Sequence, residues 1–379
     1  MEFNFSEEQV MLRGLAREIL EKEVTPELQK EVEAGELWFH QGLWDSLAEA
    51  NLLGLAVPEE NGGMGFGMPE LCVLLEELGR TVAPLPVYAS LVLGGLPLAE
   101  FGSAEQKQEW LEGIASGEVI FSGALFADER GAEYADPGVS ATREEAGWVL
   151  DGRRSLVPAA PIARRILVPA RTPGGMSLFL VDPGAEGVGL EARRVTNREP
   201  LYELGLDRVR VPGEALLGGE DGRGAEILAW LRERATLATC ALHVGVCERA
   251  IQLTADYVRE REQFGVPIGS FQAVQHRLAD NFMDLEAMRW TLWRAAWRIA
   301  EGLPAAREVA VAKFWAADGG TRIVSSAQHL HGGFGVDLDY SIHRYFLWSK
   351  TLELNLGSAT PQLARLGADM ARTGPQESS

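Results

Sequence analysis

One carboxylate that could take a proton is Glu233, in the stretch "LRERATLATCAL" (231–242), where Arg234 follows it directly. A carboxylate that enters an apolar helical bundle has its pKa raised above the usual ~4.3, which suits it to proton abstraction near neutral pH. The alternative is an acidic residue in the first turns of a helix, where it interacts favourably with the helix dipole. On the pattern alone, the second interpretation is the more common one.

A second stretch has the residues to bind a pyrophosphate. "REREQFGVPIGSFQAVQHRLAD" (259–280) predicts a helix that ends at Arg259 and Arg261, a Gly-Val-Pro turn, and a new helix from about Ser270. Arginines beside a helix N-terminus suit a pyrophosphate because their charge combines with free backbone N–H groups. A solvated run of charges followed by a turn explains the same pattern, and the pattern does not decide between the two.

A third stretch, "SSAQHLHGGFGVD" (325–337), predicts a helix that ends in a Gly-Gly turn. Paired glycines allow close approach of the backbone to a ligand, although a plain C-terminal cap is their commoner use. His329 and His331 are two residues apart, so they lie on different faces of the helix and do not chelate a metal. We therefore expect no metal site.

The elements that position these residues change character along the chain. Helical periodicity covers the first third, beginning after Ser6 at "EEQVMLRGLAREILEKEV", and Pro84, Pro86 and Pro97 are expected to break one segment of it. Short β-branched runs bounded by Gly, Pro and Asp follow, and then long Ala-rich helices. The predicted class is α+β multidomain: an all-α domain (1–118), a small β-barrel or sandwich domain (119–218) and a four-helix bundle (219–375).

Composition excludes several classes of protein. The 379 residues carry a net charge of −20, which disfavours a nucleic-acid binder. Three scattered cysteines do not make a disulfide framework; they fit small buried residues in a reduced cytoplasm. The N-terminus lacks a signal-peptide pattern, and no run approaches the ~20 apolar residues that span a bilayer.

Three stretches in this order, with a β domain between helical domains, resemble the acyl-CoA dehydrogenase family over nearly the whole chain. They are the N-terminal "LWDSLAEANLLGLAVPEENGGMGFGMPELCVLLEELGR", then "REQFGVPIGSFQAVQHRLAD", which resembles the Arg-x-x-Phe-Gly…Phe-Gln stretch that binds the flavin, and "QHLHGGFGVDLDYSIHRYF", which resembles the Gln-x-x-Gly-Gly-x-Gly stretch. The resemblance implies an α domain, a β domain and a four-helix bundle, assembled as a tetramer of dimer pairs, with FAD between the β domain and the bundle.

The resemblance also implies roles for particular residues. The adenosine diphosphate part of FAD would be held across a subunit interface by Arg261, Gln263, Phe264 and Gln272. The same cofactor would be met from the partner chain by Gln328, Gly332 and Gly333. The reaction implied is removal of the α-proton of an acyl-CoA thioester by a carboxylate and transfer of the β-hydrogen as hydride to flavin N5, with an electron-transfer flavoprotein as acceptor.

The chain departs from the family pattern at the usual base. Many members carry a Glu-Gly-Thr triplet, onto which Leu356-Gly357-Ser358 falls, so Ser358 is expected at the cofactor and Leu356 cannot take a proton. Glu353 lies one turn earlier and is expected to be a helix residue, as a charge or salt-bridge partner. The isovaleryl and long-chain branches place the base just before an arginine on the first long bundle helix, which assigns the base to Glu233 and its electrostatic, substrate-binding neighbour to Arg234.

A second departure lies in the β domain. The family's Thr-Glu-Pro and Trp-Ile-Thr segments, which line the flavin ring, are replaced by "ALFADERG" (124–131) and "RRSLVPAA" (153–160). Such erosion resembles subunits of mixed acyl-CoA dehydrogenase tetramers that act on bulky acyl-CoAs, so a partner subunit without its own turnover is a second hypothesis. A flavin oxidase or monooxygenase of the same fold is a third.

Overall fold

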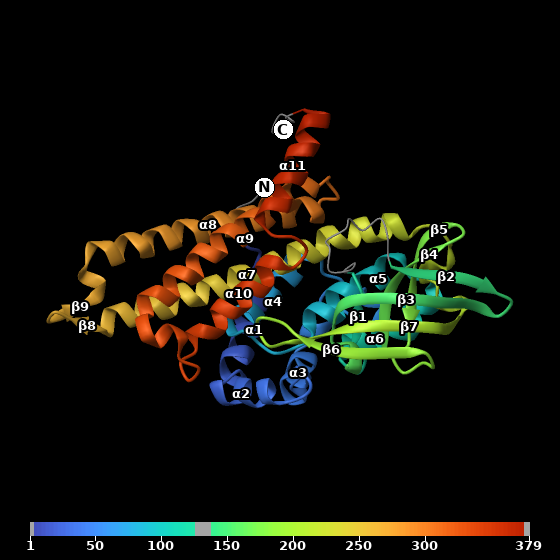
Figure 1. The fold of residues 1–379 in the computed structure, drawn as a ribbon, viewed down its shortest axis with the longest axis horizontal. Coiled ribbons are helices and arrows are strands. Elements are labelled where there is room, and N and C mark those ends of the chain that lie inside the picture. The colour runs from blue at the N-terminus through green and yellow to red at the C-terminus, as the bar shows by residue number, and fades with distance from the viewer. Residues whose placement is uncertain (1–3, 126–137, 375–379) are drawn as a thin grey trace. The chain divides into compact units, whose positions relative to one another are not determined.

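The computed structural model describes residues 4–125 and 138–374, and the chain divides into two compact units. The first unit comprises residues 1–26, 72–83 and 236–379, and the second comprises residues 27–71 and 84–235. Figure 1 labels the elements of both. Most of the segment 124–131, "ALFADERG", lies outside the described residues.

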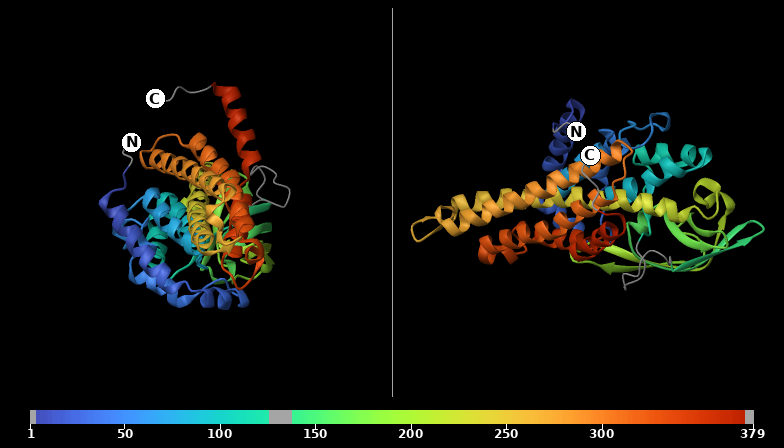
Figure 2. Two further views of the ribbon diagram at one scale, coloured as in Figure 1. Left: turned by 90° about the vertical axis from the view of Figure 1, so that its left-hand side faces the viewer. Right: turned by 90° about the horizontal axis from the view of Figure 1, so that it is seen from above.

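The first unit is helical. Its helices are α1 (Glu7–Glu23), most of α4 (Met68–Thr81) and of α7 (Gly224–Glu260), α8 (Gln272–Ala300), α9 (Ala306–His331), α10 (Ile342–Leu354) and α11 (Ala359–Thr373). Helix α1 begins where the sequence predicts, because Ser6 and Gln9 form a reciprocal capping box. The central helix α7 has 37 residues, and α8, α10 and α11 all contact α9, as Figure 2 shows for the α8–α9 pair.

Two glycines set how closely α4 approaches α7. A Cβ at Gly79 would lie 2.0 Å from the carbonyl oxygen of Leu242, and one at Gly245 would lie 1.9 Å from that of Glu76. Only glycine allows two helix backbones to come this close. The three cysteines, Cys72, Cys240 and Cys247, are free and buried, as expected from the sequence.

The second unit combines short helices with a sheet. Its helical elements are most of α2 (Pro26–Ala34), α3 (Gln41–Glu49), the 3₁₀ turns η1 (Leu52–Gly54), η2 (Glu59–Asn61), η4 (Ala160–Ile162), η5 (Gly213–Ala215) and η6 (Leu217–Gly219), the π-helix η3 (Tyr88–Gly95), α5 (Leu96–Phe101), α6 (Ala104–Ala115) and the first turns of α7. The expectation that Pro97 breaks this region is wrong, because helix continues from Tyr88 to Phe101. Pro97 stands in the first turn of α5, where a missing N–H costs little.

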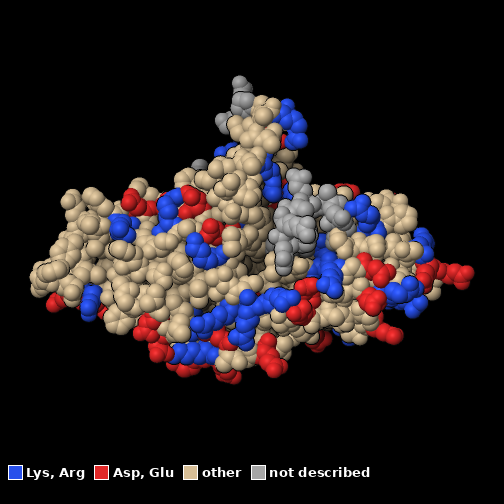
Figure 3. Space-filling model, viewed as in Figure 1, with Lys and Arg blue, Asp and Glu red and all other residues tan. Residues whose placement is uncertain are grey.

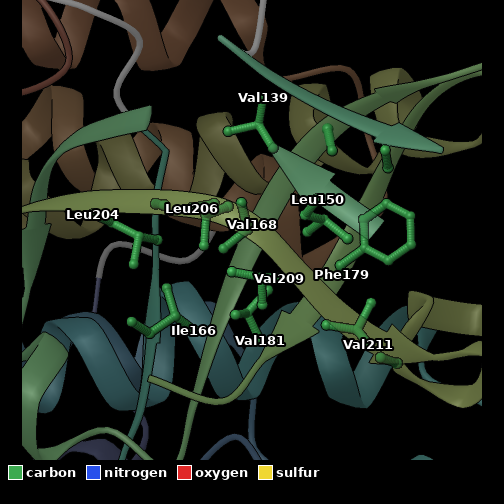
Figure 4. Packing of buried hydrophobic residues seen from close by; sticks show 14 of the residues in the cluster. Val139, Leu150, Ile166, Val168, Phe179, Val181, Leu204, Leu206, Val209 and Val211 are labelled. Atoms are coloured by element: carbon green, nitrogen blue, oxygen red, sulfur yellow. The ribbon is translucent and has the colours of Figure 1, made fainter. Parts of the chain in front are cut away.

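The sheet has seven strands in the order β1-β4-β2-β3-β7-β6, with β5 paired to β4. The strands are β1 (Phe121–Gly123), β2 (Val139–Glu144), β3 (Gly147–Pro158), β4 (Arg165–Thr172), β5 (Gly175–Val181), β6 (Val188–Arg194) and β7 (Pro200–Pro212). Among the strand pairs of the described residues, β1–β4 and β2–β4 are parallel and the others are antiparallel. Alternate side chains, among them Ile166, Val181, Leu204 and Val209, form the buried core seen in Figure 4. The predicted class of N-terminal helices, a middle β domain and C-terminal helices is confirmed.

Among the described residues, no helix is long and apolar enough to span a membrane. The same part of the chain contains no group of three or more histidine, cysteine, aspartate or glutamate side chains able to hold a metal ion.

Candidate functional site

An open pocket of about 500 Å³ lies on the first unit where α9 ends. Four residues expected at the cofactor line it together in one chain: Arg261, Gln263, Gly332 and Gly333. The sequence suggested that the two glycines meet the cofactor from a different chain than the arginine does. The structure brings both groups to one pocket because the end of α7 and the end of α9 lie next to each other, with the Tyr257 ring stacked on that of His331 at 4.4 Å.

The Arg261 side of the pocket is a small hairpin. Strands β8 (Glu262–Gln263) and β9 (Val266–Pro267) pair across a turn in which Phe264 and Gly265 both have positive φ. The Ile268 N–H closes the hairpin by donating to the carbonyl oxygen of Arg261 at 2.8 Å. This turn leaves the Phe264 side chain 94% exposed, with its ring edge-on to that of Phe271 at 6.2 Å between centroids.

The glycine side of the pocket is the 3₁₀ turn η8 (Gly332–Val336), which follows α9. Gly332 has φ 58° and ψ −128°, a backbone conformation that favours glycine. A Cβ at Gly332 or Gly333 would meet nothing within 4 Å, so the space beside these glycines is open to a ligand. The residues present therefore fit an anionic dinucleotide, with a guanidinium on one wall and side-chain-free backbone on the other.

Four of the expected cofactor residues do not line this pocket, and the exposed Phe264 is one of them. The Gln328 amide donates to the carbonyl oxygen of Gly335 at 3.2 Å, which turns it toward its own chain. Gln272 is the exposed first residue of α8. Ser358 precedes α11, and its side chain makes no capping hydrogen bond. His329 and His331 do line the pocket. From the sequence we considered them only as a possible metal-binding pair, which their spacing excluded.

Glu233 and Arg234 lie on the part of α7 that belongs to the second unit. Burial raises the pKa of the half-buried Glu233 carboxyl, and the neighbouring Arg234 and Arg232 oppose that rise. The Arg234 guanidinium lies 3.7 Å from the Trp230 ring centroid and donates to the Trp230 carbonyl oxygen at 3.2 Å. The carboxyl thus has the raised proton affinity that a general base needs, beside a cation held in place by an aromatic ring.

The triplet position is occupied by a buried, tightly bound turn. Leu356 is 5% exposed with φ 57°, and the Gln362 amide donates to the carbonyl oxygens of Leu356 and Gly357. Glu353 accepts hydrogen bonds from Lys350 Nζ at 2.9 Å and from Thr321 Oγ1 at 2.7 Å. Burial alone would raise the pKa of Glu353, but these two donors outweigh it and lower that pKa. The expectation that Glu353 is a salt-bridge partner in a helix is confirmed.

The stretch 153–160, expected beside the flavin ring, ends β3 in an irregular backbone. Leu156 and Ala159 both have positive φ, and the pairing of β3 with β7 shifts register between Arg154 and Val157. The Ser122 hydroxyl donates to the carbonyl oxygen of Pro158 at 2.5 Å. The stretch therefore departs from regular strand geometry and lacks the indole and hydroxyl of the family pattern.

Comparison with known proteins points to one family for both the N-terminal and the C-terminal part of the chain. Residues 6–118 match the model of the acyl-CoA dehydrogenase N-terminal domain, and residues 222–371 match that of the C-terminal domain. The chain is 41% identical over 381 residues to acyl-CoA dehydrogenase FadE27 of Mycobacterium tuberculosis, covering 98% of this chain and 100% of that protein.

Solved structures give the same answer. The ChsE4-ChsE5 complex from Mycobacterium tuberculosis matches with a TM-score of 0.93 and 41% identity, covering 99% of this chain and 100% of the matched chain. A variant of the Tcur3481-Tcur3483 steroid ACAD matches with a TM-score of 0.89 and 44% identity, covering 97% of this chain and 98% of the matched chain. The chain therefore belongs to the acyl-CoA dehydrogenase family.

Proposed function

We propose that the chain is an FAD-dependent acyl-CoA dehydrogenase that uses Glu233 as its base. The observation that carries the proposal is a half-buried carboxyl whose pKa burial raises, on α7, in a chain whose usual base position holds Leu356. A carboxylate with raised proton affinity is better matched to the α-proton of a thioester than an exposed one. Arg234 would keep the site's charge balanced and help to hold the substrate.

The pocket at the end of α9 is the proposed site for the dinucleotide part of FAD. Arg261 would pair with the pyrophosphate, Gln263 would hydrogen-bond beside it, and the open backbone of Gly332 and Gly333 would let the cofactor approach closely. Bound FAD would supply the hydride acceptor for a 2-enoyl-CoA product. Gln272, Gln328 and Ser358 stay predictions at the level of the family resemblance.

Assembly with a second chain is part of this proposal. Large apolar side chains are exposed on the hairpin and along α8, with Phe264 94%, Met283 61% and Phe282 57% exposed. In Figure 3 the surface around the hairpin is mostly uncharged, whereas blue and red side chains lie among the uncharged ones over α8. Exposed apolar patches of this kind mark sites of association. We propose a dimer or tetramer, in which Phe264 contacts the neighbouring chain, and an electron-transfer flavoprotein as the electron acceptor.

A second candidate is a subunit that completes an FAD site without turnover of its own. Two observations favour it. Leu356 cannot act as a base, and each of the two solved structures described above is named for a pair of proteins. The second of these structures is named as a steroid ACAD. In that case the base would come from the other chain, and the substrate would be a bulky acyl-CoA.

The visible spectrum of the purified chain separates the two candidates. A yellow protein that bleaches anaerobically with a panel of acyl-CoAs supports a self-sufficient dehydrogenase. A colourless protein that takes up FAD only with a second chain supports the partner subunit. NADH- and oxygen-dependent hydroxylation would point instead to a monooxygenase.

A further inference from the structure

A second, smaller pocket of about 40 Å³ lies within the second unit. Its wall carries three large aromatic side chains: Trp38 from the segment between α2 and α3, Tyr88 from η3 and Tyr202 from β7. Prolines and aliphatic side chains complete the wall. Among the described residues that line this pocket, Glu199 carries the single charged side chain, so a carboxyl group stands in otherwise aromatic and apolar surroundings.

The Glu199 carboxyl group is fixed at this wall by the turn that precedes β7. Its Oε2 accepts a hydrogen bond from Asn197 Nδ2 at 3.3 Å, and its backbone N–H donates to Asn197 Oδ1 at 3.2 Å. Burial raises the pKa of this carboxyl from 4.5 to about 6, and the Asn197 amide only partly opposes the rise. A carboxylate in such a place has lost hydration that one amide donor does not replace.

Within residues 4–125 and 138–374, no cationic side chain forms an ion pair with Glu199. The adjacent Arg198 pairs instead with Glu33, at 3.3 Å. The charge that acts on Tyr202 is also negative, because burial and then the Glu36 carboxylate raise the pKa of its hydroxyl. The pocket therefore has negative charge to offer and no positive charge of its own.

The size of the pocket limits which cation can enter. A buried water needs about 10–15 Å³ of such space, so the pocket has room for roughly three non-hydrogen atoms. A primary ammonium group with two carbons has that size, whereas a quaternary ammonium is larger. The ammonium N–H groups donate to a carboxylate, and aromatic rings attract the cation as well as its carbons.

We propose that this pocket binds a small primary alkylammonium ion, which pairs with the Glu199 carboxylate and places its carbons against Trp38, Tyr88 and Tyr202. This site goes beyond the proposed function, which uses none of these four residues. Loss of this site would therefore leave the assignment of Glu233 as base untouched, and failure of that assignment would leave this site untouched.

Ethylammonium is the probe, and ethanol is its uncharged counterpart of equal size. Binding to the full-length chain is followed by NMR of labelled tyrosine rings at about pH 7.5, where most of the Glu199 carboxyl is ionised. The chain has six tyrosines, so Tyr88→Phe and Tyr202→Phe assign the two signals of the pocket. Tetramethylammonium tests the size limit, because it has five non-hydrogen atoms.

Ethylammonium should shift both signals with a dissociation constant on the order of 10 mM, as suits so small a ligand. Ethanol and tetramethylammonium should each bind at least about tenfold more weakly. Glu199→Gln should weaken ethylammonium binding by a similar factor. Glu203→Gln is the matched control, because Glu203 also lies at the start of β7 but pairs on the surface with Arg153 and Arg193, both at 3.4 Å, and it should bind as the wild type does.

Equal affinity of the wild type for ethylammonium and ethanol would overturn the inference, because the pocket would then select only for apolar carbons. Unchanged ethylammonium binding in Glu199→Gln would overturn it as well. The comparison of the three probes uses the wild type alone, so it decides the matter even where Glu199→Gln does not fold.

Discussion

Replacing Glu76 with glutamine should stabilise the first unit above pH 7. Glu76 lies in α4, 3% exposed, and its Oε2 accepts from Arg13 Nη2 at 3.1 Å, while its Oε1 has no hydrogen-bond partner among the described residues. Burial raises the pKa of this carboxyl from 4.5 to about 7, and the Arg13 and Arg289 charges only partly oppose the rise. The ion pair with Arg13 therefore does not fully offset the free-energy cost of burying the Glu76 charge.

The magnitude follows from linkage between proton binding and folding. A carboxyl whose pKa is raised in the folded state stabilises the fold fully below pH 4.5, and that stability is lost as the pH rises to 7. A pKa raised from 4.5 to about 7 corresponds to about 3 kcal/mol of lost stability above pH 7. Glutamine has the shape of the protonated acid and does not titrate, so Glu76→Gln should recover up to about that amount at about pH 8 and change little at about pH 4.5.

The assay is urea unfolding at several pH values from about 4.5 to 8, with Glu77→Gln as the matched control. Glu77 lies next to Glu76 but accepts two hydrogen bonds from Arg17, at 2.7 and 2.9 Å, and also pairs with Arg80 at 3.3 Å. Breaking this buried pair should cost about 3 kcal/mol at about pH 8. Opposite signs for the two glutamates are the expected result; equal destabilisation by both would refute the reasoning.

Three further predictions concern the packing and surface of the first unit. Gly245→Ala places a Cβ 1.9 Å from the Glu76 carbonyl oxygen, so it should push α4 away from α7 and lower the free energy of unfolding in urea by about 1–3 kcal/mol. Gly14→Ala is the control, because a Cβ at Gly14 would meet nothing within 4 Å. Phe264→Ser removes an exposed ring, so it should change the stability of the chain by less than about 0.5 kcal/mol but shift its mass in solution toward the monomer; unchanged mass would contradict the proposed interface. Gln362→Ala strips the Leu356 and Gly357 carbonyl oxygens of their donor, so it should cost about 1–3 kcal/mol and speed amide exchange at residues 355–358; unaltered exchange would show that this turn is held otherwise.

Local signals in the sequence predicted the elements well. The Ser6 capping box, the Gly-Pro punctuation of the strands and the long Ala-rich helices all correspond to elements of the structure. Strand β6 does not stand out as a β-branched run, because "VGLEARR" carries one β-branched residue, Val188, and is mostly exposed. Pro97 was misread because a proline is tolerated in the first turn of a helix, here directly after the π-helix η3.

The site was harder to predict because it depends on contacts between residues far apart in sequence. The sequence identified Arg261, Gln263, Gly332 and Gly333 but not that one chain brings all four to one pocket, since this requires the ends of α7 and α9 to meet. The direction of the Gln328 side chain depends on its position around the axis of α9, which changes by about 100° with each residue. For Glu233, the apolar helical setting in the sequence gave the reason to expect a raised pKa. Burial in the structure also raises the pKa of this carboxyl.

The central claim is that Glu233 takes the α-proton, and anaerobic bleaching of the FAD-loaded protein by acyl-CoA tests it most directly. The wild type should bleach, and the control Glu353→Gln should bleach equally because Glu353 is engaged with Lys350 and Thr321. Glu233→Gln should keep its FAD and bleach about 10²–10⁴-fold more slowly, the usual contribution of a general base. Bleaching of Glu233→Gln at the rate of the wild type would contradict the account.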